Sequence, residues 1–473
     1  MSEPTDAELD ALLTARPSMS RAQLRLLVGG WAPPPPGALP WAGAEPRARR
    51  RAELADAFPA EWLVVPSGRP QRRCNDLLYP FRPGSDFTWL VGDDEPGSVL
   101  VVDPSGASTL YRDERPALGD PLSLIDGHRG AFWAGQPTPS PVVAAELGLA
   151  VLPLSLLPGV LADARSGRAI HGLDADVDAA IPTSDASAEL PRTIARMRLM
   201  KDTHEIALLR QTAADTVAGF AALAAALPAA VAHGEAHLEG VFARHARTVG
   251  HGPAYNSVVG AGDHATVLHW MRNDGAVRAE DLVLVDAGVE GAERYAADVT
   301  RTFPVSGSFT LEQRAVYDVV FAAQEAALAL VRPGAALRDL HAAALEVVGA
   351  GLRRLGVLTD EVAGELTDAQ AAVRWMPHGI GHMLGVDLHD CTAVAAEWMT
   401  APLEPGHVIT VEPGVYLSPH DAHVPGHLRG IGVRIEDDVV VTEDGYENLT
   451  AALPRSSDDV ERWITSINAR GAA

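Results

Sequence analysis

Apolar side chains recur at three- and four-residue spacing between residues 195 and 220, the spacing of an amphipathic helix. Asp202, three residues before Glu205, has the spacing of a capping box, so the helix should begin there. The apolar face that this predicts consists of Ile206, Leu209, Ala213, Val217 and Phe220.

Two more helices are predicted further along the chain. Thr310 and Gln313 repeat the capping spacing, and the periodic pattern that follows ends near residues 331–334. Residues 337–356 form the next helical stretch. The second half of the chain is therefore rich in helices.

The preceding part of the chain is rich in β-prone runs. They are WLVVPSG (62–68), FTWLVG (87–92) and SVLVVDPSGASTLYR (98–112). The third predicts a hairpin that turns at residues 103–106, and residues 164–173 are expected to be helical. This alternation predicts an α/β domain over residues 53–192.

The two ends of the chain have a different character. APPPPGALP (32–40) is typical of a polyproline spacer, and EPRARRRAE (45–53) is expected to be a solvated basic run. We therefore expect an N-terminal extension over 1–52, a second domain over 193–456 and a tail over 457–473.

Composition excludes several classes of protein. The chain has 473 residues, 47% of them hydrophobic, which predicts two globular domains. Its formal charge of −24 disfavours nucleic acid and anionic membranes as partners. Two cysteines, Cys74 and Cys391, exclude a disulfide framework. With no signal-peptide pattern and no segment expected to span a bilayer, we expect a cytoplasmic protein.

Acidic residues interrupt two apolar runs between residues 282 and 305. A hairpin turning near Ala292 would place Asp286 opposite Asp298, with both side chains on the same side of the sheet. Opposed carboxylates repel each other, and strand interiors disfavour aspartate. A cation between them would remove the conflict, but a buried hydrogen-bonded pair fits this pair of residues equally well.

Other strands repeat the anomaly. Glu412 follows an apolar β-run, and Glu436 lies inside another. Residues 378–390, HGIGHMLGVDLHD, add three histidines. Four carboxylates with one imidazole suit Mn²⁺, Co²⁺ or Zn²⁺, and they are enough for two ions that share bridging carboxylates.

Five blocks occur in order: VDAG, ADVTRTF, HGIGH, VEPG and RIEDD. This order resembles the pita-bread metallopeptidases and, within them, the Xaa-Pro aminopeptidases (aminopeptidase P). The resemblance covers residues 73–454, and RRCNDLLYPFRPGSDFTWLVG resembles the N-terminal domain of aminopeptidase P. It implies an α+β fold in which a C-terminal pita-bread catalytic domain follows a smaller N-terminal α/β domain.

The resemblance also implies a ligand set for two divalent metal ions. Asp286 would bind one ion, Asp298 and Glu436 would bridge both, and His382 and Glu412 would complete the second. Mn²⁺ is the expected metal, with Co²⁺ and Zn²⁺ as alternatives. The same resemblance implies a homo-oligomer, either a dimer or a tetramer.

Four further residues match family positions near the metals. His269, His378 and His389 would line the substrate pocket and contact substrate, and Arg434 would lie beside a bridging ligand. His378 has an alternative, purely structural role, in which it locks the glycine-rich loop by a backbone hydrogen bond. The implied reaction is metal-assisted hydrolysis of the bond before a proline at the second position of a peptide, with Glu412 as general base.

One position departs from the family pattern. Members often carry an aromatic residue directly after the Asp-Phe pair, where it reaches a neighbouring subunit. Here Thr88 takes that position and Trp89 follows. On a strand, a shift of one residue turns the side chain to the opposite face, so we do not transfer the subunit contact to this chain.

Other interpretations compete with this function. A prolidase, which cuts only Xaa-Pro dipeptides, would use nearly the same metal ligands, and a non-catalytic pita-bread module would bind peptides or proteins. A zincin helix is disfavoured because glycines follow His378 where HExxH requires glutamate. Cys391 is expected to be a small core residue, and the histidines at 420, 423 and 427 are expected to be solvated in a loop.

Overall fold

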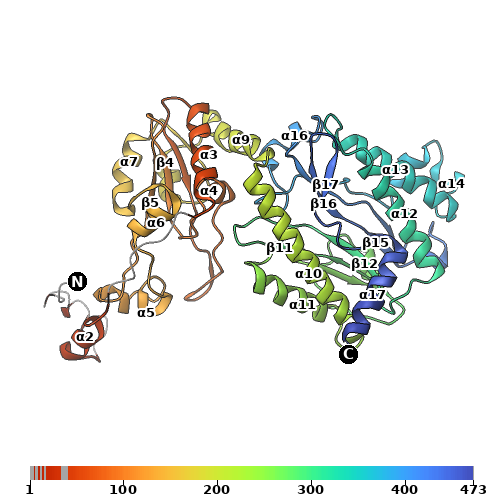
Figure 1. The fold of residues 1–473 in the computed structure, drawn as a ribbon, viewed down its shortest axis with the longest axis horizontal. Helices are drawn as coiled ribbons and strands as arrows, with labels where there is room; N and C mark the ends of the chain where they lie inside the picture. Colours follow the sequence, from red (N-terminus) through yellow and green to blue (C-terminus); the bar gives the residue numbers. More distant parts are fainter. Residues whose placement is uncertain (1–4, 6–8, 11–12, 15–17, 33–40, 472–473) are drawn as a thin grey trace. The chain divides into compact units, whose positions relative to one another are not determined.

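In a computed structural model of the chain, the described residues are 5, 9–10, 13–14, 18–32 and 41–471. The chain divides into two compact units, Met1–Ile194 (unit 1) and Ala195–Ala473 (unit 2). The predicted proline-rich spacer falls almost wholly on residues 33–40, outside the described residues. Helix α9 (Asp185–Leu199) carries the chain from the first unit into the second (Figure 1).

Unit 1 is built on a five-stranded sheet in the order β6-β5-β4-β1-β7. The strands are β1 (Leu63–Pro66), β4 (Val99–Val102), β5 (Ser108–Arg112), β6 (Ala150–Pro153) and β7 (Arg168–Ala169). The expected hairpin is confirmed, because β4 pairs antiparallel with β5 and the amide of Gly106 donates to the carbonyl of Asp103. β6 and β7 pair in parallel at the two edges, so the sheet is mixed.

Helices and a small hairpin complete unit 1. The helices include α2 (Arg21–Val28), α3 (Ala44–Ala57), α4 (Ser85–Leu90), α5 (Ala131–Ala134), α6 (Ser140–Leu147), α7 (Leu157–Asp163) and α8 (Ala175–Ala180). The hairpin, β2 (Arg72–Cys74) with β3 (Leu77–Leu78), is exposed along its whole length.

Two sequence predictions for unit 1 were wrong. Residues 87–92 belong mainly to helix α4, in which Thr88 and Trp89 are both buried, so the argument from opposite strand faces does not apply. A short apolar run that is buried all round has no periodicity to separate helix from strand. Residues 164–173 are a turn followed by β7, since Gly167 closes the turn after α7.

The basic run at 45–53 was also interpreted wrongly. It lies in α3, where Arg47, Arg50 and Arg51 are buried. Their guanidinium groups donate to the last carbonyls of α4, those of Thr88, Trp89 and Leu90. Carbonyls at a helix end lack partners within the helix and attract cations, which explains why these charges are inside. Burial and the nearby Arg47 lower the pKa of Arg51 to about 10.

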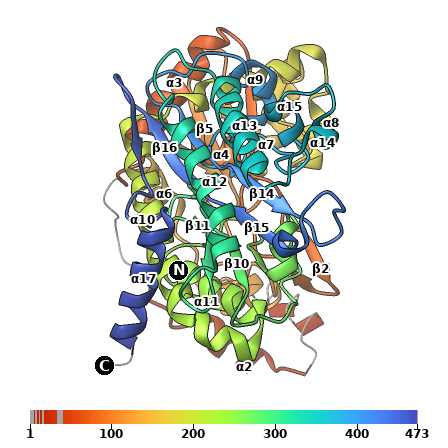
Figure 2. The same ribbon diagram turned by 90° about the vertical axis from the view of Figure 1, so that its right-hand side faces the viewer.

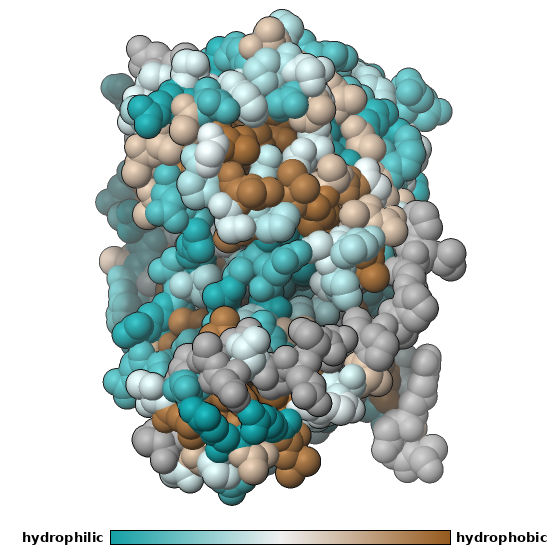
Figure 3. All heavy atoms as spheres, turned by 90° about the vertical axis from the view of Figure 1, so that its left-hand side faces the viewer, coloured by the Kyte–Doolittle hydropathy of each residue, from teal (hydrophilic) through white to brown (hydrophobic). Residues whose placement is uncertain are grey.

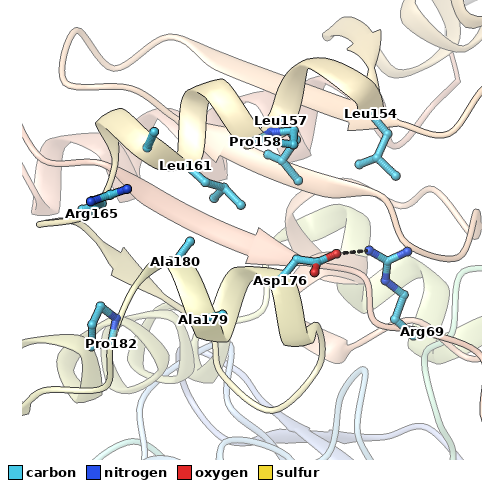
Figure 4. A pocket seen from close by; sticks show the side chains of 11 residues that line it. Arg69, Leu154, Leu157, Pro158, Leu161, Arg165, Asp176, Ala179, Ala180 and Pro182 are labelled. Atoms are coloured by element: carbon cyan, nitrogen blue, oxygen red, sulfur yellow. Dashed lines mark hydrogen bonds and ion pairs between the residues drawn. The ribbon is translucent and has the colours of Figure 1, made fainter.

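Apolar side chains gather on the face of unit 1 that Figure 3 shows. Between α7 and α8 lies a groove of about 770 Å³ (Figure 4). Leucines of the α7 side form one wall, small residues of the α8 side form the other, and Arg165 and Arg69 stand at opposite ends. Residues of unit 1 alone line this groove, so it is separate from the acidic strands discussed above.

Unit 2 consists of small antiparallel sheets with long helices around them (Figures 1 and 2). Its sheets are β12-β10-β9, β13-β16-β17, β14-β15 and β11-β8. The strands are β8 (Gly252–Pro253), β9 (Val258–Ala261), β10 (Leu282–Asp286), β11 (Val289–Glu290), β12 (Thr300–Pro304), β13 (Val408–Val411), β14 (Gly414–Leu417), β15 (Ile431–Arg434), β16 (Asp437–Val441) and β17 (Tyr446–Asn448).

The helices of unit 2 cover these strands. They include α10 (Thr203–His233), α11 (Glu235–Val249), α12 (Leu311–Leu328), α13 (Leu337–Arg354), α14 (Asp360–Ala363), α15 (Asp368–Ala372), α16 (Ala395–Trp398) and α17 (Ser457–Gly471). Both predicted capping boxes are present, at Asp202 for α10 and at Thr310 for α12. Residues 457–471, which we expected to lie in a tail, form α17, and its Val460 and Ile464 enter the core.

Helix α10 corrects one expectation. It is long enough to cross a membrane, and an 18-residue window within it has a mean hydropathy of 1.6. By length and composition this helix could span a bilayer, although we expected no such segment. Its buried face, including Phe220, Leu223 and Leu227, belongs to the core of unit 2. The buried core helix of a globular domain has this composition as well.

We expect Arg47→Ala to lower the free energy of unfolding of unit 1 by about 2–4 kcal/mol, because it removes the arginine donor to the carbonyl of Thr88 at the buried end of α4 and the side chain that packs over Trp41. Arg49→Ala is the matched control, since Arg49 is exposed on the same helix and pairs with Glu45 and Glu53 on the surface. Urea unfolding measures both variants, and equal effects would contradict this account.

Candidate active site

Four carboxylates meet at the ends of strands in unit 2. Asp286 is the last residue of β10, and Asp298 lies just before β12. Glu412 follows β13, and Glu436 lies between β15 and β16. Helices α12 and α13 lie across one side of these strands (Figures 1 and 2), and α12 contacts β13, β14 and β15.

The register of the β10–β12 hairpin differs from the sequence prediction. Asp286 pairs with Thr300, so the turn is centred at residue 293 and Asp298 lies two positions from the residue that faces Asp286. The two aspartates still converge. The phenol oxygen of Tyr255 lies 2.5 Å from Oδ1 of Asp286 and 2.6 Å from Oδ1 of Asp298.

A group of metal-ligand type forms around these residues. One oxygen each of Asp298 and Glu436 and one ring nitrogen of His382 all lie within 4.8 Å of one another. Nε2 of His382 lies 3.3 Å from Oδ2 of Asp298 and 3.7 Å from Oε1 of Glu412. The expected ligands Asp298, His382, Glu412 and Glu436 therefore face a common point, with Asp286 linked to them through Tyr255.

The tautomer of His382 follows from its hydrogen bonds. Nδ1 lies 3.0 Å from the carbonyl of Met383 and must donate to it, so Nε2 is the atom left to face the carboxylates. Burial opposes charge on both partners, but the hydrogen bond between His382 and Asp298 raises the pKa of the histidine to about 9 and lowers that of the aspartate. A cation at this point would replace the proton.

Electrostatics also favour a cation. Burial and the charges of Asp298 and Glu412 raise the pKa of Glu436 well above its usual range. Burial raises the pKa of Glu412 to about 7, and it raises the pKa of Asp286 even though Arg434 opposes the shift. Buried carboxylates that repel one another in this way form a hard-oxygen donor set with one imidazole, which fits divalent metal ions.

Arg434 organises the side of the site next to Asp286. Its Nη2 donates to Oδ2 of Asp286 at 2.6 Å, its Nη1 to the phenol oxygen of Tyr416 at 2.9 Å, and its Nε to the hydroxyl of Thr300 at 3.0 Å. The Thr300 hydroxyl in turn donates to Oε2 of Glu436 at 2.7 Å. Arg434 thus orients two carboxylates, one of them directly.

A cavity of about 530 Å³ opens onto the carboxylates. All the predicted site residues line it, together with Tyr255, Asn256, Val258, Leu268, Met271 and Leu388. His269 and His389 are exposed at its wall, and the ring of His389 lies 4.3 Å from that of His382. Burial and the neighbouring His382 lower the pKa of His389, so it is neutral at pH 7.

His378 is engaged at both ring nitrogens. Nδ1 lies 2.8 Å from the carbonyl of Gly379 and donates to it, while Nε2 lies 2.9 Å from the hydroxyl of Tyr416 and accepts from it. Burial and Arg434 lower its pKa to about 4, which keeps the ring neutral. The backbone bond of the structural alternative is therefore present, and substrate contact by this ring remains a prediction.

Three site residues escaped the sequence reasoning. Tyr255, Tyr416 and Thr300 each bond to a predicted site residue. Tyr255 lies three residues before the start of β9, in the segment HGPAYNSVVG, but a tyrosine whose partners are 31 and 43 positions away leaves no local pattern.

Two smaller expectations can be checked. Cys391 is buried in the core of unit 2, as expected, and burial raises the pKa of its thiol above the usual range. Within the described part of the chain, the histidines at 420, 423 and 427 belong to no group of metal-ligand type.

Comparison with known proteins identifies the class. The model of metallopeptidase family M24 matches residues 207–443, and that of the aminopeptidase P N-terminal domain matches residues 47–169. The chain belongs to metallopeptidase family M24, in the branch that carries the aminopeptidase P N-terminal domain. It is a metalloaminopeptidase, and the expected pita-bread domain with a smaller N-terminal domain is confirmed.

Individual relatives agree with this assignment. Xaa-Pro aminopeptidase 1 of Streptomyces coelicolor is 43% identical over 90% of this chain and 88% of its own. The Xaa-Pro aminopeptidase of Escherichia coli is 34% identical over 88% of this chain and 97% of its own. The solved structure of E. coli aminopeptidase P with the inhibitor Pro-Leu covers 91% of this chain and all of its own, with a TM-score of 0.78 and 31% identity.

We expect His382→Ala to lose bound metal as well as activity, because Nε2 of His382 is the only ring nitrogen of the described residues in the group of metal-ligand type. His378→Ala should keep most of its metal, because both ring nitrogens of His378 are engaged elsewhere, and should lose turnover by roughly 10²–10³-fold if it contacts the reacting group. Metal analysis, melting temperature and kcat distinguish the two. Equal metal loss in both variants would contradict these roles.

Proposed function

We propose that the protein removes the N-terminal residue from peptides whose second residue is proline, and that a divalent metal centre supports the hydrolysis. The observation that carries this proposal is the convergence of Asp298, His382, Glu412 and Glu436 at the end of a peptide-sized cavity. The curated relatives described above are Xaa-Pro aminopeptidases. They favour aminopeptidase P over prolidase, the nearest alternative in the sequence analysis.

The ligand assignment remains as the resemblance implied it. Asp286 and the pair His382 and Glu412 would each hold one ion, and Asp298 and Glu436 would be shared between the two. Bound ions of this kind polarise the scissile carbonyl and lower the pKa of the attacking water. Every ligand position carries the expected type of residue, which argues against a non-catalytic binding module.

Glu412 acts as the general base in this proposal. Burial raises its pKa to about 7 in the metal-free cluster. A carboxylate placed beside the attacking water is a group that can take a proton from it. The hydroxyl of Thr410 lies 3.4 Å from its Oε1 and His378 lies 3.8 Å from its Oε2, which leaves the group oriented toward the cavity.

The histidines at the cavity wall handle the substrate. His269 and His389 are exposed to the cavity and, among the described residues, neither makes a side-chain hydrogen bond, so their ring nitrogens are available to a peptide. Imidazoles in this position can donate a hydrogen bond to the oxyanion, or can take up a proton and pass it to the leaving proline nitrogen. Arg434 keeps Asp286 and Tyr416 in place beside them.

Further properties are part of the same proposal. Mn²⁺ is the metal that we propose for the site, with Co²⁺ and Zn²⁺ as alternatives that suit the same ligands. We propose a cytoplasmic homo-oligomer, either a dimer or a tetramer, without a nucleic-acid or membrane partner. The strong negative charge and the burial of one face of α10 in the core support the absence of these two partners.

We expect the protein, supplied with Mn²⁺, to release only the first residue from Xaa-Pro-Yaa peptides and to leave Xaa-Ala-Yaa controls uncut. Mass spectrometry of the products, with and without chelator, checks the cleavage position and the metal dependence together. Cleavage confined to Xaa-Pro dipeptides would replace this function by that of a prolidase.

A further inference from the structure

Glu235 is a buried acidic residue that takes no part in the metal centre. It is the first residue of α11, and its side chain is fully buried. Each of its two carboxylate oxygens accepts two hydrogen bonds. Oε1 accepts from the amide of Ala261 and from Nδ1 of His264, each at 2.8 Å. Oε2 accepts from the indole of Trp270 at 2.8 Å and from the amide of Gly275 at 2.7 Å.

All four donors belong to one segment, residues 261–275, which we call the 261–275 loop. The loop includes the short helix Gly262–Thr266 and connects β9 to the chain that leads into β10. Leu268, His269 and Met271 of this loop line the cavity. The carboxylate of Glu235 therefore binds the 261–275 loop at both of its ends and in its middle.

The backbone closes around the same carboxylate. The amide of Glu235 donates to the carbonyl of Gly275 at 3.0 Å, which joins the start of α11 to the end of the loop. A Cβ atom at Gly275 would lie 2.8 Å from Oε1 of Glu235 and 2.5 Å from the ring of His264. Only glycine therefore allows this close approach.

His269 itself has no anchor of its own. In the described part of the chain its ring makes no hydrogen bond, so its place depends on its neighbours along the loop. Trp270, the next residue, bonds to Glu235 and stacks on His264 with ring centroids 3.7 Å apart. The amide of Met271 donates to the carbonyl of His269 at 2.9 Å, and this bond holds the backbone on both sides of Trp270 in a turn.

We propose that Glu235 is a positioning residue, which holds His269 at the cavity wall through Trp270 and the 261–275 loop. This rests on the proposed peptidase function and deepens it. A carboxylate can accept from all four donors, whereas a glutamine side chain would turn an NH₂ group toward two of them. A misplacement of about 1 Å in a group that orients substrate can cost about 10²-fold in rate, so the loss of this anchor should be measurable.

The test is a double-mutant cycle of Glu235→Gln with His269→Ala on an Xaa-Pro-Yaa peptide. We expect Glu235→Gln to keep the wild-type metal content and to lower kcat/KM by roughly 10–100-fold. In the His269→Ala background the same change should cost less than about threefold, because both changes act through one group. Effects that multiply in the double variant would overturn the proposal.

Trp270→Phe is the second variant, because it keeps an aromatic ring beside His264 and removes the indole donor to Glu235. It should reproduce the kinetic effect of Glu235→Gln in part, even if the latter folds poorly. Glu205→Gln is the matched control, since Glu205 is equally buried and accepts from Tyr295 and Asp202 rather than from the loop. It should leave kcat/KM within about twofold of wild type.

Amide hydrogen exchange separates this proposal from the proposed function. Exchange in residues 261–275 should be faster in Glu235→Gln and Trp270→Phe than in wild type or Glu205→Gln, whatever peptide the enzyme cleaves. If wild type fails to cleave Xaa-Pro peptides but the loop loses protection, the anchor stands and the proposed function falls. Unchanged exchange in both loop variants would overturn the anchor itself.

Discussion

Mutual repulsion among buried carboxylates is the constraint on which the rest of the catalytic unit depends. Asp286, Asp298, Glu412 and Glu436 come from four strand ends and meet at one cavity, with Asp298 and Glu436 buried and the other two half-buried. No single helix or hairpin could bring them together, so their meeting depends on how the sheets of unit 2 are arranged. Arg434 compensates the charge of Asp286, and a cation would compensate the others together.

The surroundings keep these strands in register. Arg301 and Asp437 form a fully buried ion pair at 2.6 Å that joins β12 to β16. The carboxylate of Asp390, held by Lys201 at 2.9 Å, fixes the chain beyond His389. The amide of Asp390 donates to the carbonyl of Met383, the same carbonyl that sets the tautomer of His382.

The four acidic residues of the proposed ligand set could be singled out from the sequence, because an acidic residue beside or within an apolar strand is unusual enough to be recognised locally, and the structure brings all four to one cavity. The sequence predicted the hairpin register less well, because a turn placed one residue too early, at 292 instead of 293, shifts the pairing by two residues. The bridge between Glu290 and Ala296 is centred on the same residue 293, and Arg294 in the turn has a φ of 69°.

The features that sequence reasoning missed depend on distant contacts. Tyr255 and Glu235 act through partners many residues away, so their roles appear only once the chain is folded. The arginines of α3 were expected to face solvent, because a run of basic residues is usually exposed. The carbonyls of α4 that accept from them lie about forty residues further along the chain, so the sequence around α3 does not reveal them. Pattern and spacing describe single elements, and these residues act between elements.

The most direct test of the central claim is to titrate the metal-free protein with Mn²⁺ and to measure binding by calorimetry. The proteins compared are wild type, Asp298→Ala, Glu436→Ala and the exposed control Asp274→Ala. If the carboxylates are held together by shared ions, wild type and Asp274→Ala should bind two ions per chain, and each of the other variants should lose most of this binding. Near-normal binding by Asp298→Ala or Glu436→Ala would contradict the account.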